Sequence, residues 1–176
     1  MLRLRSMPRI RSLILMCFLF GGLQDPSWSQ PVLVKMGING PTCSACARSV
    51  EMQIRKLPFV RDVVMDIAGT EASVLIAPDR SFLPEKLMKA VYKAGFSVRD
   101  FRVRMNASEF RVISSNRLEW AGSEYIILSG HLPDGRQGSE ARIIARKYLP
   151  ESERKEILDS YSIDPQNRKS KFILFL

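Results

Sequence analysis

Two of the three cysteines in the sequence, Cys43 and Cys46, lie three positions apart within the stretch Gly40-Pro41-Thr42-Cys43-Ser44-Ala45-Cys46. Thiols at this spacing can hold one soft metal ion, close into a disulfide, or alternate between these states. The spacing alone does not choose among them. A disulfide across so short a loop joins no distant parts of the chain, so the pair indicates chemistry rather than a structural crosslink.

The setting of the pair favours thiolates, because a predicted strand precedes it and an amphipathic helix begins within it. Cys46 is expected in the first turn of that helix, with Cys43 in the loop just before it. Unpaired N–H groups and the positive end of the helix dipole stabilise negative sulfur there. Two thiolates select soft ions such as Cu(I), whereas zinc prefers four ligands. The single histidine, His131, is expected to be an ordinary loop residue outside this site.

Two other interpretations of the pair remain open. A thiol-disulfide oxidoreductase also places two cysteines at this spacing at the start of a helix. Such enzymes usually carry an aromatic residue before the first cysteine, whereas Thr42 holds that position here. The third interpretation is an interaction scaffold in which the cysteine pair binds no metal.

The elements that position the pair follow from hydrophobic periodicity. Alternating apolar residues predict strands over 34–38, 63–67, 72–76 and 96–103. Helical spacing predicts one helix from Ala45 to Leu57 and a second that begins at Pro84 and ends before a capping Gly95. The order βαββαβ predicts an α+β, ferredoxin-like sandwich over residues 30–104, with two helices on one face of a four-stranded antiparallel sheet.

Element order and motif together resemble the heavy-metal-associated domain, a family that includes copper chaperones, parts of metal-pumping ATPases and periplasmic mercury-binding proteins. The family's run of glycine, methionine, threonine and two cysteines corresponds to residues 40–46, and Thr-Cys-Ser-Ala-Cys is the form common in the mercury-binding members. Gly95-Phe96 matches the family's glycine-aromatic pair. The resemblance implies that Cys43 and Cys46 are the metal ligands and that the ion is Cu(I) or Hg(II), with Zn(II) disfavoured.

Three residues near the pair refine this comparison. Pro41 stands where the family has a methionine that packs beneath the loop, which affects loop rigidity and metal preference. Thr42 stands where zinc-handling members often carry an acidic residue, which argues against zinc. Phe96 is expected close to the loop, either as a shield for the metal or as part of the ordinary core.

Residues 105–176 are predicted to form a small β-rich second domain of unknown role. Apolar runs over 110–113, 118–120 and 125–128 favour a β meander. Farther along, the sequence predicts a turn at Pro133-Asp134-Gly135, a strand over 141–148, a helix over 150–161 and a final strand over 171–176. About 70 residues without a disulfide make a marginal independent fold, so this part is expected to pack on the first domain or on a partner.

The first 29 residues are typical of a secretory signal peptide. Four arginines precede the apolar run 13–23, which is shorter than the roughly 20 residues that span a bilayer. Small residues at Ser27 and Ser29 suit cleavage, and Cys17 belongs to the apolar core of the signal. Removal of residues 1–29 takes away four Arg and one Asp, so the net charge falls from +9 to +6.

These features predict an exported, non-enzymatic protein of the bacterial periplasm that carries one soft metal ion. The expected partner is a thiol-containing metal donor or acceptor, such as a membrane metal transporter. Nucleic acid is not expected, because no block of basic residues interleaved with aromatics occurs. The mature protein is not expected to span a membrane.

Overall fold

The computed structural model describes residues 32–78, 80, 82–130, 138–164, 167 and 169–176. The predicted signal peptide over 1–29, with Cys17, lies outside the described residues, as do His131 and the predicted turn that begins at Pro133. Within the described part of the chain, no helix is both long enough and apolar enough to cross a membrane.

The first six elements follow the predicted order. They are β1 (Leu33–Asn39), α2 (Ser44–Arg55), β2 (Val60–Asp66), β3 (Glu71–Ile76), α3 (Pro84–Lys93) and β4 (Ser97–Met105). The alternating residues Val34, Met36 and Ile38 of β1 are fully buried, which is the pattern that predicted the strand. Pro84 opens α3, and Gly95 follows it with φ +88°, as a left-handed helix end requires.

The second part of the chain is also rich in strands. Its elements are the short 3₁₀ helix η1 (Ala107–Glu109), β5 (Phe110–Ser114), β6 (Arg117–Trp120), β7 (Ser123–Ser129), β8 (Ser139–Ile144), α4 (Glu151–Ser160) and β9 (Phe172–Phe175). Strands β5, β6 and β7 pair antiparallel in sequence order, which confirms the meander. The predicted strand over 141–148 ends at Ile144, because the chain then turns and buries Tyr148 and Leu149.

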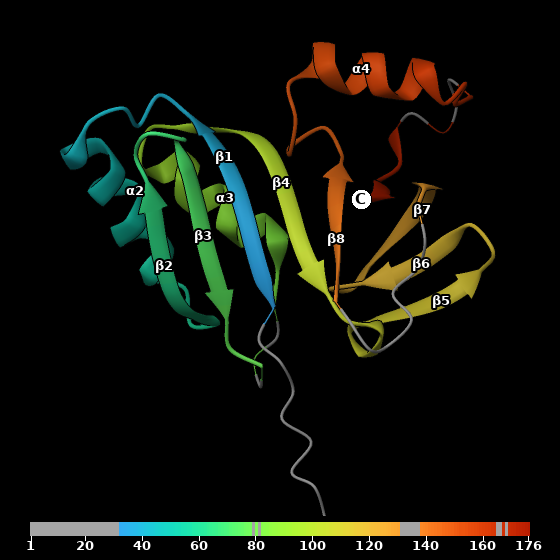
Figure 1. Cartoon of the computed structure of the whole chain (residues 1–176), viewed down its shortest axis with the longest axis horizontal. Coiled ribbons are helices and arrows are strands. Elements are labelled where there is room, and N and C mark those ends of the chain that lie inside the picture. Colours follow the sequence, from blue (N-terminus) through green and yellow to red (C-terminus); the bar gives the residue numbers. More distant parts are fainter. Residues whose placement is uncertain (1–31, 79, 81, 131–137, 165–166, 168) are drawn as a thin grey trace, which may run out of the picture.

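The nine strands of the described residues belong to one sheet, with the order β2-β3-β1-β4-β8-β9-β7-β6-β5 (Figure 1). The four predicted strands therefore form one half of a larger sheet, and the expectation of a sheet that stops at four is corrected. The physical reason is that β8 pairs antiparallel with β4 from Arg102↔Arg142 to Met105↔Ser139, so β4 is not an edge. The boundaries 30–104 and 105–176 stay predictions.

One hydrophobic core runs through both halves. The ring of Phe101 on β4 contacts Tyr148 at 5.0 Å between centroids, and Phe82 contacts Trp120 at 5.4 Å. All four residues pack in the same apolar cluster. A second, smaller cluster lies around Leu158 of α4. The second half therefore packs on the first, which was one of the two arrangements expected for it.

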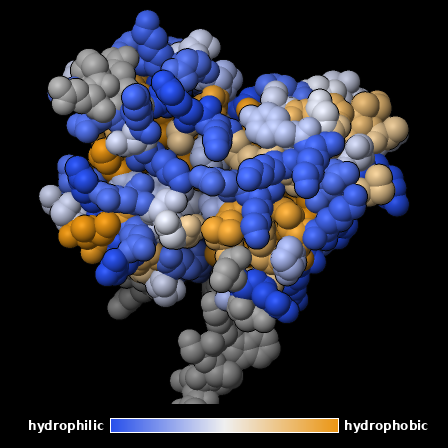
Figure 2. All heavy atoms as spheres, turned by 180° about the vertical axis from the view of Figure 1, so that it is seen from behind, coloured by the Kyte–Doolittle hydropathy of each residue, from blue (hydrophilic) through white to orange (hydrophobic). Residues whose placement is uncertain are grey.

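The helices α2 and α3 cover one face of the first four strands (Figure 1). Seen from behind, hydrophilic side chains separate the hydrophobic ones into small patches (Figure 2). Exposed apolar side chains such as Met52 on α2 and Tyr92 on α3 are consistent with this mixed surface. Exposed apolar residues scattered in this way are ordinary for a folded protein.

Candidate functional site

Cys43 and Cys46 lie at the start of α2, where the sequence places them. Cys43 is the N-cap residue, with extended backbone angles φ −116° and ψ 154°, and Cys46 lies in the first helical turn. The two residues are joined by a disulfide, with 5.1 Å between their Cα atoms. The structure therefore brings both predicted ligands together in their oxidised form.

The sulfur of Cys43 takes the role that a serine or aspartate oxygen usually has at a helix start. The backbone N–H of Cys46 donates a hydrogen bond to Cys43 Sγ at 3.0 Å. The Cys43 carbonyl accepts the first helical hydrogen bond, from Ala47 N–H at 2.9 Å. A donor aimed at Sγ, together with the positive end of α2, stabilises negative charge on this sulfur once the disulfide is reduced.

The pair is open to solvent. Cys43 is exposed, Cys46 is partly exposed, and the neighbours Thr42, Ser44 and Ala45 are exposed as well. The first turn of α2 contains no acidic residue. Among the described residues, no group of three or more His, Cys, Asp and Glu side chains is arranged to hold a metal ion. The arrangement is therefore a two-sulfur site that an outside thiol can approach.

The loop before Cys43 lies against Phe96, the residue just before β4. Pro41, two residues before Cys43, is buried. Gly40 has φ +98°, and the backbone N–H of Thr42 donates to the Gly40 carbonyl at 2.8 Å. The Phe96 ring lies 3.4 Å from the point where a Cβ on Gly40 would be. Phe96 also packs against the core, which confirms one of its two expected roles, while its role as a shield for the metal stays a prediction.

Arg99 on β4 is a further residue at this end of the sheet, and it did not emerge from the sequence. Its guanidinium donates to the Ile38 carbonyl at 2.6 Å, to Thr70 Oγ1 at 2.7 Å and to the Gly69 carbonyl at 2.9 Å. The one available signal was Gly37, because a glycine inside a strand often marks a bulge or a close approach.

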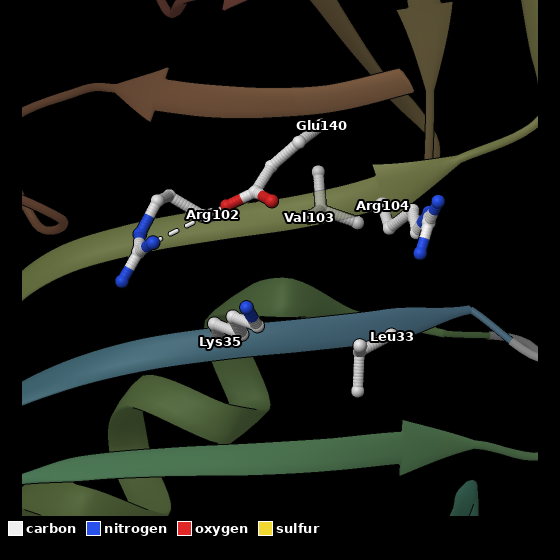
Figure 3. Close-up of a pocket in the computed structure, with 6 residues that line it drawn as sticks. All are labelled: Leu33, Lys35, Arg102, Val103, Arg104 and Glu140. Carbon is white, nitrogen blue, oxygen red and sulfur yellow. Dashed lines mark hydrogen bonds and ion pairs between the residues drawn. The ribbon is translucent and has the colours of Figure 1, made fainter. Parts of the chain in front are cut away.

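A second set of charged residues lies on the open face of the sheet, away from the helices. A cavity of about 40 Å³ lies among side chains of β1, β4 and β8, including Lys35, Arg104 and Glu140 (Figure 3). Arg102 forms an ion pair with Glu140 at 3.2 Å and another with Asp100 at 2.7 Å. Burial alone would lower the pKa of the Arg102 guanidinium, but the surrounding carboxylates raise it above its usual value. The charge of Arg102 is compensated by these carboxylates, and the cavity is too small to be the main site.

Comparison with known proteins bears on the first half of the chain. Residues 37–97 match the family described as the heavy-metal-associated domain. The chain is 42% identical over 57 residues to a protein of Arabidopsis thaliana named "Probable copper-transporting ATPase HMA5", a match that covers 32% of this chain and 6% of that protein. It is 31% identical over 114 residues to copper-transporting ATPase 2 of Rattus norvegicus, covering 61% of this chain and 8% of that protein.

Among solved structures, the chain is similar to oxidised MerP from Ralstonia metallidurans. The sequences are 32% identical, the match covers 38% of this chain and 93% of that one, and the TM-score is 0.34. The chain spans less than a tenth of the length of the two ATPases, 6% and 8% respectively. The predicted resemblance to a heavy-metal-associated domain is confirmed for residues 37–97.

Proposed function

Since residues 37–97 are a heavy-metal-associated domain, we propose that this protein binds one soft metal ion, Cu(I) or Hg(II), through Cys43 and Cys46 and passes it on by thiolate exchange. The observation that carries the proposal is the exposed cysteine pair at the start of α2, with a backbone N–H aimed at Cys43 Sγ. Two soft sulfurs, with no third ligand arranged beside them among the described residues, suit these ions better than zinc.

Metal binding starts from the reduced pair. Reduction of the Cys43–Cys46 disulfide takes up two electrons and two protons from a thiol reductant, and both protons are released when the two thiolates bind the ion. The ion is cargo and leaves by the reverse chemistry. A thiolate of the acceptor adds as a third ligand, and one cysteine of this site then dissociates and takes up a proton.

The cellular location of the protein and its partner are part of the same proposal. A secretory signal over residues 1–29 would deliver the protein to the bacterial periplasm, and mass spectrometry of the exported protein would show the cleavage. The partner would be a thiol-containing metal donor or acceptor, such as a membrane metal transporter. The copper-transporting ATPases to which the chain is similar support this class of partner. The protein would carry the ion without catalysing a reaction.

The proposal is tested by anaerobic titration of the reduced protein with Cu(I), Hg(II) and Zn(II). We expect tight binding of one Cu(I) or Hg(II) per chain, loss of this binding in Cys43→Ser and in Cys46→Ser, and weak binding of Zn(II). Ser44→Ala, between the two cysteines, is the matched control and should bind as the wild type does. Cysteine-independent binding, or none, contradicts the proposal.

The observed disulfide favours a second candidate, a thiol-disulfide redox protein that uses the same pair. This function requires the reduced protein to reduce a disulfide in a substrate protein with both cysteines present. Reduction of insulin, monitored by its precipitation, measures that activity. Activity without metal binding would favour the redox function, and absence of both would leave the interaction scaffold.

A further inference from the structure

We propose that Arg99 is the positioning residue of the Cys43–Cys46 loop, a role that rests on the metal-binding function proposed above. Arg99 joins two segments at the cysteine end of the sheet. One guanidinium nitrogen, Nη1, donates to the Ile38 carbonyl at 2.6 Å and to Thr70 Oγ1 at 2.7 Å. The other, Nη2, donates to the Gly69 carbonyl at 2.9 Å. The end of β1 and the β2–β3 turn are thereby tied to one side chain of β4.

A β-bulge directs Arg99 into this place. In the pairing of β1 with β4, Gly37 lies opposite Asp100 but Ile38 lies opposite Val98, so Arg99 is the extra residue. Bulges of this kind redirect a side chain next to functional sites. The redirected side chain lies over Gly37, whose Cβ, if it had one, would be 3.1 Å from Arg99 Cγ and 3.2 Å from Arg99 Nε.

The residues that follow Ile38 are held by the same segment of β4. Asn39 Nδ2 donates to Ser97 Oγ at 3.2 Å, and the Phe96 ring lies beside Gly40. Residues 38–40 are therefore fixed one after another by residues 96–99. Only Pro41 and Thr42 separate this fixed stretch from Cys43, so movement at Ile38 is transmitted to the first ligand.

The contacts require the planar fork of an arginine. All acceptors of Arg99 that the structure describes are neutral oxygens, on Ile38, Gly69 and Thr70, and none of the described carboxylates forms an ion pair with it. An arginine presents several N–H donors in a rigid plane, whereas a lysine places three donors on one flexible point. The role is therefore geometric, and charge alone does not replace it.

The test compares Arg99→Met and Arg99→Lys with the wild type in the reduced protein, measuring Cu(I) affinity by competition with a chelator. We expect both variants to bind Cu(I) about tenfold more weakly, the usual scale for a residue that orients metal ligands. Thr70→Val removes a single acceptor and should give a smaller loss. Arg104→Met is the matched control, because Arg104 is an exposed arginine of the same strand that lies opposite Leu33, at the end of β1 away from the cysteines.

A second readout needs no metal. Amide hydrogen exchange of residues 40–46 in the reduced, metal-free protein should speed up in both Arg99 variants and stay unchanged in Arg104→Met. Unchanged exchange and affinity, full recovery with lysine, or equal losses in Arg104→Met would each overturn the proposal. If the wild type binds neither Cu(I) nor Hg(II), the proposed function fails, while the exchange measurement still decides the positioning role of Arg99.

Discussion

The ring of Tyr148 packs edge-on against the ring of Phe101, with 5.0 Å between the centroids. Phe101 belongs to β4 in the first half of the chain, and Tyr148 follows β8 in the second half. Both side chains are fully buried in the common core. The contact therefore makes the stability of each half depend on the other.

Substitutions at Tyr148 test this dependence. Tyr148→Ala removes a buried ring and should lower the free energy of unfolding by about 3 kcal/mol or more. Urea unfolding measured by circular dichroism should still show one transition, shifted as a whole. Two separate transitions would contradict the common core.

Removal of the Tyr148 hydroxyl alone is expected to have a different effect on stability from removal of the whole ring. Its oxygen is buried without a hydrogen-bond partner among the described residues, and burial raises the pKa of this phenol above its usual range. Removing an unsatisfied polar atom relieves its desolvation cost. Tyr148→Phe should therefore leave the free energy of unfolding unchanged or raise it by up to about 1 kcal/mol. A loss of 1 kcal/mol or more would reveal a partner for the hydroxyl.

Much of the first half could be predicted because its signals are local. The buried alternation of Val34, Met36 and Ile38 reflects a strand with one covered face, and this pattern is visible in any short window of sequence. The same holds for Cys46, since the change to helical periodicity places it in the first turn of α2. The candidate site was therefore accessible from its own few residues.

The joining of the two halves could not be predicted in the same way. Pairing of Arg102 with Arg142 brings together β4 and β8, which are far apart in sequence. The sequence pattern of neither strand indicates which strand it pairs with. The strand expected over 141–148 ends early for a related reason: Tyr148 is apolar enough to continue the pattern, but its place in the core lies beside Phe101. The role of Arg99 depends on a bulge in register, which only the paired strands reveal.

We expect Asp100 to contribute more to the free energy of unfolding than the other carboxylates of the ion-pair network that joins the halves. Its two oxygens contact Arg102 Nε at 2.7 Å and Arg142 Nε at 2.6 Å, and its side chain is only 18% exposed. Asp100→Ala leaves two partly buried guanidinium groups short of a partner, so the free energy of unfolding should fall by about 1–3 kcal/mol. Urea unfolding measures the loss.

An exposed pair provides the control for Asp100. Glu124 contacts Arg117 at 2.7 Å, but both side chains are about half exposed, at 50% and 48%. Glu124→Ala should therefore cost less than about 1 kcal/mol, and added salt should remove most of the effect. Equal losses for Asp100→Ala and Glu124→Ala would show that the buried network contributes no more than a surface pair.

Glu109 should make stability fall as pH rises. Burial raises the pKa of its carboxyl above the usual range, although hydrogen bonds from Asn106 oppose this effect. The folded state then holds the proton more tightly than the unfolded state. The free energy of unfolding is therefore lowered as pH rises from the unfolded pKa through the raised folded one. The side chain introduced by Glu109→Gln is neutral at every pH. Relative to the wild type, the free energy of unfolding of this variant should therefore rise over this pH window and stay higher at pH 7.

For Glu85, the change of the free energy of unfolding with pH has the opposite sign, so this residue serves as the comparison. The ammonium of Lys171 lies 3.1 Å from Glu85 Oε1 and lowers the pKa of that carboxyl. Its contribution is present above the unfolded pKa and is lost as pH falls through the folded one. Glu85→Gln should therefore match the wild type at low pH and be less stable at pH 7. If Glu109→Gln showed the same trend as Glu85→Gln, burial would not control Glu109.

Gly40 links the fold to the metal site, because it has φ +98° and lies three residues before Cys43. An alanine at this φ costs about 1–2 kcal/mol in backbone strain, and its Cβ would lie 3.4 Å from the Phe96 ring. Gly40→Ala should therefore lower both the free energy of unfolding and the affinity for Cu(I), measured by urea unfolding and chelator competition. Gly122, with φ +69° and open space around it, is the matched control. Gly122→Ala should lose similar stability and keep the wild-type affinity; a shared loss of affinity would mean that general destabilisation, rather than the shape of the loop, weakens the site.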